Sequence, residues 1–454
     1  MRIPSLLLDS LHDTAGFSKD AFEAAHDKEK PIISVRINPS KRISQVAGLP
    51  VSRMDPVPWT GLGYYLDSRP SFTFDPLFHA GCYYVQEASS MFLEQALKQT
   101  VDLERPLRVL DLSAAPGGKS THIQSLISGD SLLVSNEVIR SRALVLKDNI
   151  IKWGAANVAV TNNDPAGFSM LENYFDVIIV DAPCSGSGLF RKDPDTISEW
   201  SINNVQLCSQ RQQRILADVL PALKKGGVLI YSTCSYSKEE NEEMVSWLMR
   251  EFDLAQISLT LDPSWGITDT GMGYRFWPDK VKGEGFFMAC FQNGIKAYEV
   301  AYKSRNKPAI PVKTELDRIG KWVRKDGIAF VKHENTVYAW PQPLAADLAL
   351  LLEKMKLIYS GVLAGELMRD KFLPAHASAL SGLVESTVPC ISLDREQAIR
   401  YLQRKEIKLA GAGRGWQRVS YLDQPLGWVN VLPTRINNYY PKELRILKES
   451  QGPG

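Results

Sequence analysis

The feature that most constrains the fold is an alternation of apolar runs and helical patterns between residues 107 and 292. The runs are short, nearly continuous and rich in Val, Ile and Leu, and they lie at 107–112, 132–135, 158–161, 175–180 and 227–232. Segments with helical spacing separate them. Strands that are apolar on both faces and joined by helices are typical of a parallel sheet covered on both sides. We therefore predict a doubly wound, Rossmann-like α/β domain over residues 106–295.

The composition limits the class of protein. The chain has 454 residues, of which 44% are hydrophobic and 23% charged, as expected for a globular protein of several domains. No stretch approaches the ~20 apolar residues of a membrane-spanning helix. The N-terminus lacks the pattern of a secretory signal, so we expect a cytoplasmic protein. The six cysteines form neither a disulfide framework nor a metal-ligand spacing, and we expect no metal site.

Two segments flank the central domain. Residues 1–105 mix short helical patterns with extended pieces, which predicts an N-terminal α+β region. A polar, proline-containing stretch at 296–314 is typical of a linker, and residues 315–454 carry enough apolar residues for a core of their own. We expect this last segment to be separable, so that deleting the chain from about residue 313 leaves ligand binding by the central domain intact.

Charge is distributed unevenly along the chain. From residue 296 onward there are 25 Lys and Arg against 16 Asp and Glu, a net charge of +9, and the preceding 295 residues carry −7. A basic C-terminal third predicts a module that binds a polyanion such as RNA. A solvated basic surface is the alternative.

A glycine-containing loop follows the first apolar run. Two glycines let a backbone approach a ligand closely, and the helix that follows offers free N–H groups. The loop nearly matches the phosphate-binding pattern G-x-x-x-x-G-K-[ST], except that a serine replaces the first glycine. A P-loop NTPase is therefore an alternative of a different class. The candidate ligand-binding residues of the loop are Ser113, Ala114, Ala115, Pro116, Gly117, Gly118 and Lys119.

Polar residues after the other strands favour an adenosyl ligand without phosphates. Glu137 closes the second strand, where a carboxylate can bind the two ribose hydroxyls. Asp164 follows the third strand and is placed to reach an adenine amino group. The strand that ends at Asp181 continues into Cys184, and thiols have no part in phosphoryl transfer. We predict S-adenosylmethionine as the ligand, and we expect Arg142 to bind a carboxylate or RNA.

Two cysteines end strands of this sheet. Cys184 and Cys234 both lie in Ser- and Gly-rich turns, where a thiolate can be exposed and activated. Thiols suit methyl transfer to a pyrimidine, because a thiolate that adds at C6 makes C5 nucleophilic enough to attack the sulfonium methyl group. An acid must stabilise charge at N3, for which Asp181 is the candidate, and a base must then remove the C5 proton. The chemistry leaves open which cysteine is the nucleophile.

With these motifs the chain resembles the Sun-type family of RNA 5-methylcytosine methyltransferases, and within it the bacterial ribosomal small-subunit methyltransferase F group. The resemblance runs in order through about two-thirds of the chain, at 35–38, 84–90, 111–119, 181–194, 232–242, 275–278 and 283–287. It implies that the Thr-Cys motif supplies the nucleophile, Cys234, and that the Pro-Cys motif supplies the residue for release, Cys184. The family usually has Cys where this chain has Ser113.

The resemblance also implies a class I methyltransferase domain, an N-terminal region that covers part of the RNA cleft, and a β-rich, PUA-like RNA-binding domain at 315–454. The expected activity is methyl transfer to C5 of cytosine in RNA, with 16S ribosomal RNA as substrate and tRNA as the alternative. An RNA-binding scaffold with a silent methyltransferase fold is a third possibility. We expect RNA as the partner, no membrane contact and a monomer.

Overall fold

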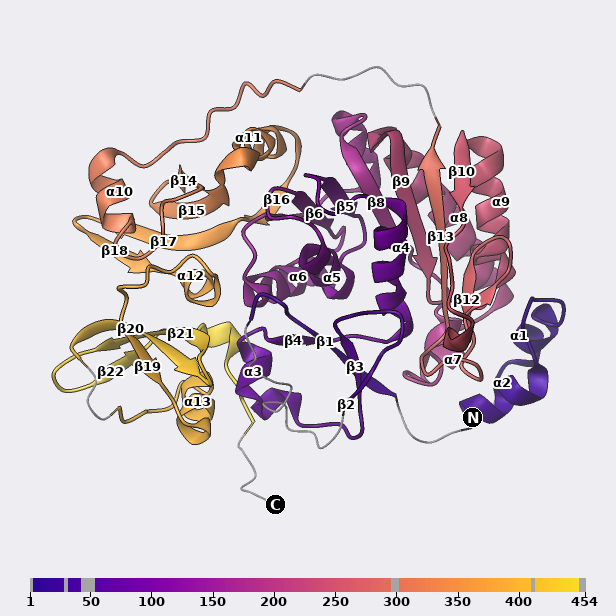
Figure 1. Cartoon of the computed structure of the whole chain (residues 1–454), viewed down its shortest axis with the longest axis horizontal. Coiled ribbons are helices and arrows are strands. Elements are labelled where there is room, and N and C mark those ends of the chain that lie inside the picture. Colours follow the sequence, from indigo (N-terminus) through magenta and orange to yellow (C-terminus); the bar gives the residue numbers. More distant parts are fainter. Residues whose placement is uncertain (1–2, 28–31, 42–53, 295–301, 410–412, 449–454) are drawn as a thin grey trace.

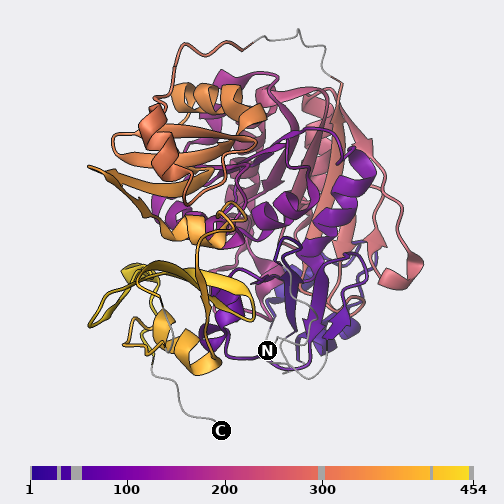
Figure 2. The ribbon, with the colours of Figure 1, turned by 60° about the vertical axis from the view of Figure 1, so that its left-hand side comes forward.

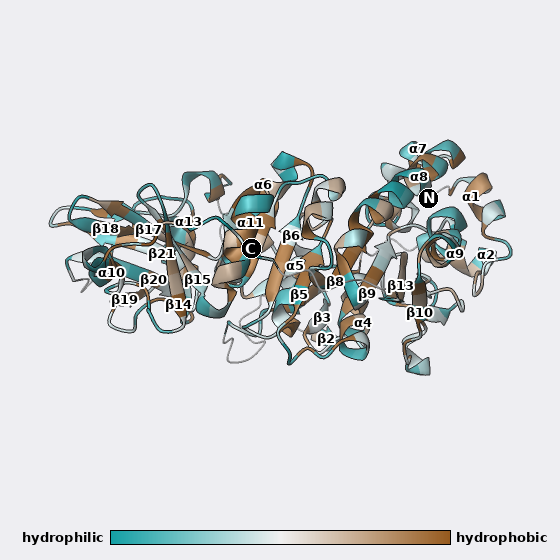
Figure 3. Ribbon diagram, turned by 90° about the horizontal axis from the view of Figure 1, so that it is seen from above, coloured by the Kyte–Doolittle hydropathy of each residue, from teal (hydrophilic) through white to brown (hydrophobic). Residues whose placement is uncertain are grey.

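The computed structural model describes residues 3–27, 32–41, 54–294, 302–409 and 413–448. A large twisted sheet forms the centre, with helices on both faces and two smaller β-rich units to one side of it (Figure 1). The N-terminal helix pair lies at the opposite end of the central sheet, as the view from above shows (Figure 3). The predicted fold class is confirmed. Part of the predicted linker, residues 295–301, lies outside the described residues.

The central sheet has the strand order β11-β12-β13-β9-β8-β5-β6-β7-β16. The five strands from β9 to β7 are parallel, and β10, β11, β12, β13 and β16 pair antiparallel. The strands are β5 (Arg108–Asp111), β6 (Leu132–Asn136), β7 (Val158–Thr161), β8 (Phe175–Asp181), β9 (Leu223–Thr233), β10 (Leu254–Ile257), β11 (Thr268–Asp269), β12 (Tyr274–Phe276), β13 (Phe286–Asn293) and β16 (Leu357–Ser360). The helices of this part are α5 (Gly118–Leu126), α6 (Arg140–Trp153), α7 (Thr196–Glu199), α8 (Ile202–Val219) and α9 (Glu242–Glu251).

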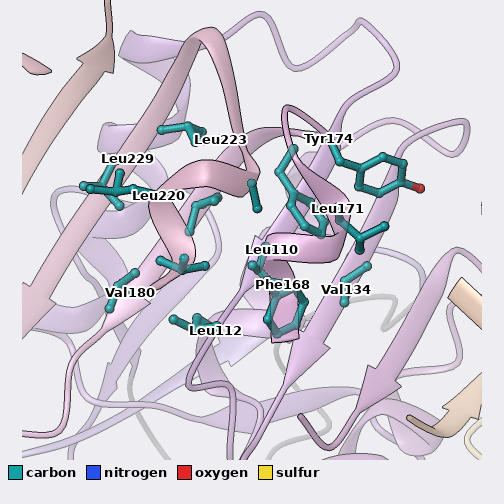
Figure 4. Packing of buried hydrophobic residues seen from close by; sticks show 14 of the residues in the cluster. Leu110, Leu112, Val134, Phe168, Leu171, Tyr174, Val180, Leu220, Leu223 and Leu229 are labelled. Atoms are coloured by element: carbon teal, nitrogen blue, oxygen red, sulfur yellow. The ribbon is translucent and has the colours of Figure 1, made fainter. Parts of the chain in front are cut away.

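Period-two alternation in the strands builds a core on each face of the sheet. Leu110 and Ile178 belong to the cluster on the side of α8 and α9, part of which is seen in Figure 4. Val109 and Ile179, their sequence neighbours, belong to the cluster on the side of α5 and α6. Burial on both faces explains why the strands are nearly continuous apolar runs in the sequence.

The N-terminal region forms a sheet of its own, in the order β2-β3-β1-β4. Arg36 of β1 is fully buried, and its guanidinium donates to Gln86 Oε1 at 2.8 Å and to Thr121 Oγ1 on α5 at 2.5 Å. This sheet is therefore fixed to the central domain. The elements are α1 (Ser5–Ser10), α2 (Lys19–His26), β1 (Ile33–Ile37), β2 (Met54–Pro56), β3 (Gly63–Leu66), α3 (Pro76–His79), β4 (Tyr83–Val85) and α4 (Leu93–Thr100).

The C-terminal part contains two four-stranded sheets, each attached to a different neighbour. We call residues 302–384 the middle module and residues 388–446 the terminal module. The middle module comprises α10 (Lys313–Ile319), β14 (Ile328–His333), β15 (Thr336–Pro341), α11 (Ala345–Lys354), β16, β17 (Val362–Met368), β18 (Lys371–Pro374) and α12 (His376–Leu380). The terminal module comprises β19 (Cys390–Ser392), α13 (Arg395–Leu402), β20 (Gly415–Tyr421), β21 (Gln424–Val431) and β22 (Ile436–Asn438).

The middle module is built into the central sheet. Its β16 pairs with β7, and its α11 contributes Leu348 and Leu351 to the core of the central sheet. The terminal module packs instead on the N-terminal region, below the middle module in the rotated view (Figure 2). Residues after 313 are thus not one separable unit, because the edge strand of the central sheet comes from among them. The division of the chain at 105, 295 and 314 remains a prediction.

Candidate active site

The glycine loop joins β5 to α5 through a left-handed turn. Gly117 has φ of +117°, and a Cβ there would lie 3.3 Å from Leu146 Cδ1 of α6. A side chain at this position is therefore disfavoured by both backbone and space. Helix α5 begins at Gly118, so its first N–H groups face the same edge of the sheet at which β5 ends.

A cavity opens beside this loop. The cavity is lined by most of the predicted loop, by Asp181, and by residues of β4 and the turn after it. The residues of β4 and its turn belong to the motif at 84–90 but were not predicted to be part of the ligand site. The lining residues are Tyr84, Val85, Gln86, Glu87, Ser90, Ser113, Ala114, Ala115, Pro116, Gly118, Lys119 and Asp181.

Asp111, the last residue of β5, is fully buried at this edge. Its Oδ2 accepts a hydrogen bond from Ser120 Oγ at 2.6 Å, whereas Oδ1 has no hydrogen-bond partner among the described residues. Burial raises the pKa of this carboxyl to about 7. A buried, unpaired carboxylate oxygen beside a glycine loop suits a ligand that carries a cationic or hydrogen-bond-donating group, and the amino acid end of S-adenosylmethionine carries both.

Glu137 and Arg142 connect the second strand to the glycine loop. Glu137 is 2% exposed, and its carboxylate accepts from Ile139 N at 2.9 Å and lies 3.3 Å from Arg142 Nη1. Arg142 also donates through Nη2 to the Ala115 carbonyl at 3.0 Å. Arg142 therefore joins the loop to the Glu137 carboxylate from α6, and its binding of a ligand or of RNA stays a prediction.

Asp164 is exposed and begins the 3-10 segment η4 (Pro165–Leu171), with its Oδ1 accepting from Ala166 N at 3.1 Å. Neither Asp164 nor Glu137 is among the residues that line the cavity beside the loop. Both follow parallel strands at the same edge of the sheet, where ligands of such sheets bind.

Lys119 and Asp181 form an ion pair between the loop and the end of β8. Lys119 Nζ lies 2.8 Å from Asp181 Oδ2, and Ser232 Oγ donates to Asp181 Oδ1 at 2.8 Å. The negative charge of Asp181 raises the pKa of Lys119 despite burial, which acts in the opposite direction. The pair presents a fixed cation and a carboxylate, which is 35% exposed, to whatever binds at this edge.

The two cysteines meet at the ends of β8 and β9. Cys184 Sγ and Cys234 Sγ lie 3.0 Å apart, as neighbouring parallel strands require, and both residues are half-buried. The hydrogen bond with Cys234, together with burial, raises the pKa of the Cys184 thiol well above its usual value. Either sulfur can donate in this contact, and the raised pKa favours the protonated form of Cys184.

One buried carboxylate near the cysteines was not predicted to belong to the site. Glu240, in the 3-10 turn η7 (Lys238–Glu240), accepts hydrogen bonds from the serines that follow the two cysteines. Glu240 lies within the motif at 232–242. The signal available was its place six residues after Cys234.

Within the described ranges, no three His, Cys, Asp or Glu side chains gather as a metal site. The same part of the chain contains no helix long and apolar enough to cross a membrane.

Comparison with known proteins now places the chain. Family models match three consecutive parts: an N-terminal domain of 16S rRNA methyltransferase RsmF at 3–88, 16S rRNA methyltransferase RsmB/F at 98–292, and the methyltransferase RsmF PUA domain at 388–446. Ribosomal RNA small subunit methyltransferase F of Cronobacter sakazakii is 30% identical over 97% of this chain and 96% of its own. The chain belongs to the RsmB/F methyltransferase family.

Solved structures agree with this family at the level of the catalytic fold. A methyltransferase homologue from Pyrococcus horikoshii is 28% identical, with a TM-score of 0.52, over 64% of this chain and all of that one. NSun6 from the same organism, solved with SFG, has a TM-score of 0.54 over 64% of this chain and 98% of that one, at 19% identity, and supports the fold alone.

Membership in the RsmB/F family decides between the classes left open by the sequence. The protein is a methyltransferase that depends on S-adenosylmethionine, and the P-loop NTPase alternative is wrong. The resemblance stated from the motifs is confirmed, and so is a PUA domain near the C-terminus. This PUA domain is the terminal module described above.

Proposed function

We propose that this protein transfers a methyl group from S-adenosylmethionine to C5 of a cytosine in the RNA of the small ribosomal subunit. The observation that carries this proposal is the contact of Cys184 Sγ and Cys234 Sγ at 3.0 Å, next to the Lys119–Asp181 pair. A thiol pair has no use in methylation of a hydroxyl or an amine, but covalent activation of a pyrimidine needs one thiolate to add and a second group to assist release.

We assign Cys234 as the nucleophile because it lies in the Thr-Cys motif, and because the raised pKa of Cys184 favours the thiol over the thiolate at that other residue. In the first step Cys234 Sγ bonds to C6, and the electron pair of the C5–C6 double bond moves toward N3 and C5. We assign the Lys119–Asp181 pair to the edge of the base that gains this charge, where Lys119 supplies the positive charge and, through Asp181, the proton that N3 takes up.

Two steps complete the reaction. C5 takes the methyl group that the cofactor supplies as an electrophilic sulfonium substituent. A base then removes the proton from C5, the C5–C6 double bond re-forms, and Cys234 leaves as a thiolate. We assign Cys184 to this last proton transfer. Cys184 accepts this proton as a thiolate, after its own proton has passed to solvent, so release becomes faster as the pH rises.

The cofactor site is proposed from the same edge of the sheet. The turn at Gly117 and Gly118, together with Lys119, would hold the methionine end of the cofactor, and the unpaired Oδ1 of Asp111 would suit its amino group. Ser113, Ala114, Ala115 and Pro116 form the rest of this cradle. Glu137 binds the ribose, Asp164 lies near the adenine, and Arg142 supports the loop.

The RNA partner and its location are part of the proposal. The relative from Cronobacter is named for ribosomal RNA of the small subunit, and the terminal module is a PUA domain in a basic part of the chain. A ribosomal substrate implies a cytoplasmic site of action. A monomeric state remains a prediction, which light scattering of the purified protein would test.

Separate substitution of the two cysteines tests the assigned roles. Cys234→Ala abolishes methylation, because C5 stays unreactive without addition at C6. Cys184→Ala still adds and methylates but releases slowly, so that an RNA–protein band survives denaturing electrophoresis. The double variant gives no band. Cys390→Ala, which removes an exposed cysteine far from the pair in sequence, is the matched control and retains activity.

The opposite pattern, with a band from Cys234→Ala, would show that Cys184 is the nucleophile and Cys234 the residue for release. Full activity in both single variants would show that the reaction does not use a covalent adduct with either cysteine. Bisulfite sequencing of total RNA with and without the gene identifies the target, and a cytosine in tRNA that loses its methyl group would replace the ribosomal substrate.

A further inference from the structure

The loop with Cys184 follows β8 and the loop with Cys234 follows β9, and the carboxylate of Glu240 accepts hydrogen bonds from both loops. Ser185 follows Cys184, and Ser235 follows Cys234. Their hydroxyl groups each donate to Glu240 Oε2 at 2.5 Å, and Ser185 N donates to Oε1 at 2.8 Å. The two hydroxyl oxygens also lie 3.2 Å from each other. A single side chain therefore spans the gap between the loops one residue away from each thiol.

Glu240 is itself fixed in place by the scaffold. Gln212 of α8 donates through Nε2 to Glu240 Oε1 at 3.2 Å and to the Pro183 carbonyl at 3.0 Å. Tyr231 of β9 donates its hydroxyl to the Glu240 carbonyl at 2.6 Å and lies 3.0 Å from Gln212 Oε1. The carboxylate is thus connected to a long helix and to a central strand, both of which are rigid parts of the fold.

The burial of Glu240 argues for a specific role. Its side chain is 0% exposed, and burial raises the pKa of its carboxyl, although hydrogen bonds from Ser185 and Ser235 oppose that shift. A buried carboxylate is costly unless its oxygens are bonded, and here both oxygens accept. The loops are also linked directly: Gly188 N donates to the Cys234 carbonyl at 2.9 Å, Tyr236 N donates to Ser187 Oγ at 2.9 Å, and the thiols contact each other. None of these other links fixes both loops to the scaffold through one buried charged side chain.

We propose that Glu240 is the positioning residue that sets the separation of the two thiols, acting through Ser185 and Ser235. The thiols must both reach one pyrimidine ring, Cys234 at C6 and Cys184 near the proton on C5. A displacement of about 1 Å in such a site costs on the order of 100-fold in rate. This role rests on the proposed cysteine chemistry, but the thiol separation can be measured without any methyl transfer.

Dibromobimane provides that measurement, because it becomes fluorescent when two neighbouring thiols displace both of its bromines. We expect rapid cross-linking in the wild-type protein and none in Cys184→Ser, which shows that the signal comes from this pair. Glu240→Ala lowers the cross-linking rate by about tenfold or more and kcat by about 100-fold. It leaves the affinity for S-adenosylmethionine within about threefold, because the glycine loop is a separate contact set.

Glu240→Gln separates positioning from charge. The Gln amide keeps an acceptor for Ser185 N and Gln212 and offers a donor to the two hydroxyls, so we expect cross-linking within about threefold of wild type. Glu239→Ala is the matched control: the neighbouring carboxylate is half-buried and takes no part in these bonds, and the variant behaves as wild type.

Wild-type cross-linking in Glu240→Ala would overturn the positioning role, even if methylation were lost. If Glu240→Ala does not fold, Glu240→Gln decides the question, since loss of cross-linking in a folded Gln variant would overturn the role as well. Failure of the cysteine mechanism itself gives a different result, with normal cross-linking in wild type and no RNA–protein band from Cys184→Ala.

Discussion

The two C-terminal modules adjoin in sequence but are attached to different parts of the molecule. The middle module extends the central sheet through β16 and places α11 against its core, with Asp347 of α11 accepting from Arg108 Nε at 2.7 Å and from Tyr174 OH at 2.5 Å. The terminal module shares a core with the N-terminal sheet, in which Val35 and Tyr83 lie in one cluster with Tyr401 and Val429. One module therefore belongs to the catalytic scaffold, and the other, the PUA domain, is packed on the N-terminal region.

The cofactor end of the scaffold depends on the middle module. Asn163, immediately before Asp164, exchanges hydrogen bonds with the backbone of Lys356: the Lys356 N–H donates to its Oδ1 at 3.0 Å, and its Nδ2 donates to the Lys356 carbonyl at 3.4 Å. Asn162 N also donates to that carbonyl, at 2.9 Å. The loop proposed to reach the adenine is thus supported by residues that precede β16.

The largest expected effect comes from deletion. Removing residues 302–454 takes away an edge strand of the central sheet and six large apolar residues of its core, so we expect loss of cooperative unfolding and of S-adenosylmethionine binding. Removing only residues 385–454 leaves that sheet whole, and cofactor binding persists while RNA binding weakens. Calorimetry and circular dichroism on both proteins check this. If both deletions affected unfolding and cofactor binding equally, the two modules would not differ in how they support the central sheet.

A smaller effect is expected from Asp347→Ala. The substitution leaves the Tyr174 hydroxyl and the Arg108 guanidinium without their shared acceptor, and we expect the free energy of unfolding to fall by about 3 kcal/mol. Asp326→Ala, at an exposed position of the same module, changes it by less than about 0.5 kcal/mol. Urea denaturation measures both. Equal values for the two variants would mean that the contact between α11 and the central sheet adds no stability.

We expect acid to loosen the contact between the terminal module and its neighbours. Burial lowers the pKa of His79 to about 4 and that of His376 to about 3, and both lie against Tyr440. Because the folded state disfavours the protonated forms, their contribution to stability is complete above the ordinary pKa of 6.5 and is lost as the pH falls below it.

We expect each of these two histidines to account for about 1 kcal/mol between pH 7 and 5.5. Unfolding of wild type and of His376→Gln across this range tests the assignment. We expect the free energy of unfolding to depend less steeply on pH in the variant than in wild type. An unchanged slope would mean that other groups cause the acid sensitivity.

The smallest effect concerns RNA binding by the terminal module. Tyr439 is 41% exposed, its ring lies 4.2 Å from that of Trp416, and Arg435 is exposed nearby in sequence. Arg435→Gln lowers the slope of log affinity against log salt by about one, as loss of a single phosphate contact does. Filter binding at several salt concentrations measures this slope. An exposed lysine of the middle module, Lys321, provides the matched control as Lys321→Gln, and an equal loss there would contradict the distinction between the modules.

The sequence was sufficient to predict which residues lie at the ends of the parallel strands. It was not sufficient to predict contacts between segments that lie far apart in the chain. The sequence predicted that Cys184 and Cys234 lie close together, because parallel strands share their carboxyl edge, and the structure adds the 3.0 Å contact of the two sulfur atoms. Glu240 could not be found in this way, because its importance lies in hydrogen bonds from two separate loops. The same applies to β16, a four-residue edge strand whose pairing with β7 spans about 200 residues of chain and leaves no local pattern.

Arg36 is a second residue whose role could not be predicted from the sequence. Its motif marked it as notable, and an arginine in an RNA enzyme suggests a phosphate contact. The structure buries it completely and gives its donors to Gln86 and to α5. Sequence cannot distinguish an arginine that binds a partner from one that holds two segments of its own chain together, since the residue type suits both.

The core shared by the N-terminal sheet and the terminal module sets an order of events during synthesis. Val35, Leu77 and Tyr83 leave the ribosome long before the chain that covers them, which begins near residue 388. Translation of the roughly 300 intervening residues takes about 15 to 60 seconds at bacterial and eukaryotic rates. Over that interval the apolar face is open to chaperones and to other nascent chains. The enzyme becomes complete only when almost its whole length has been made.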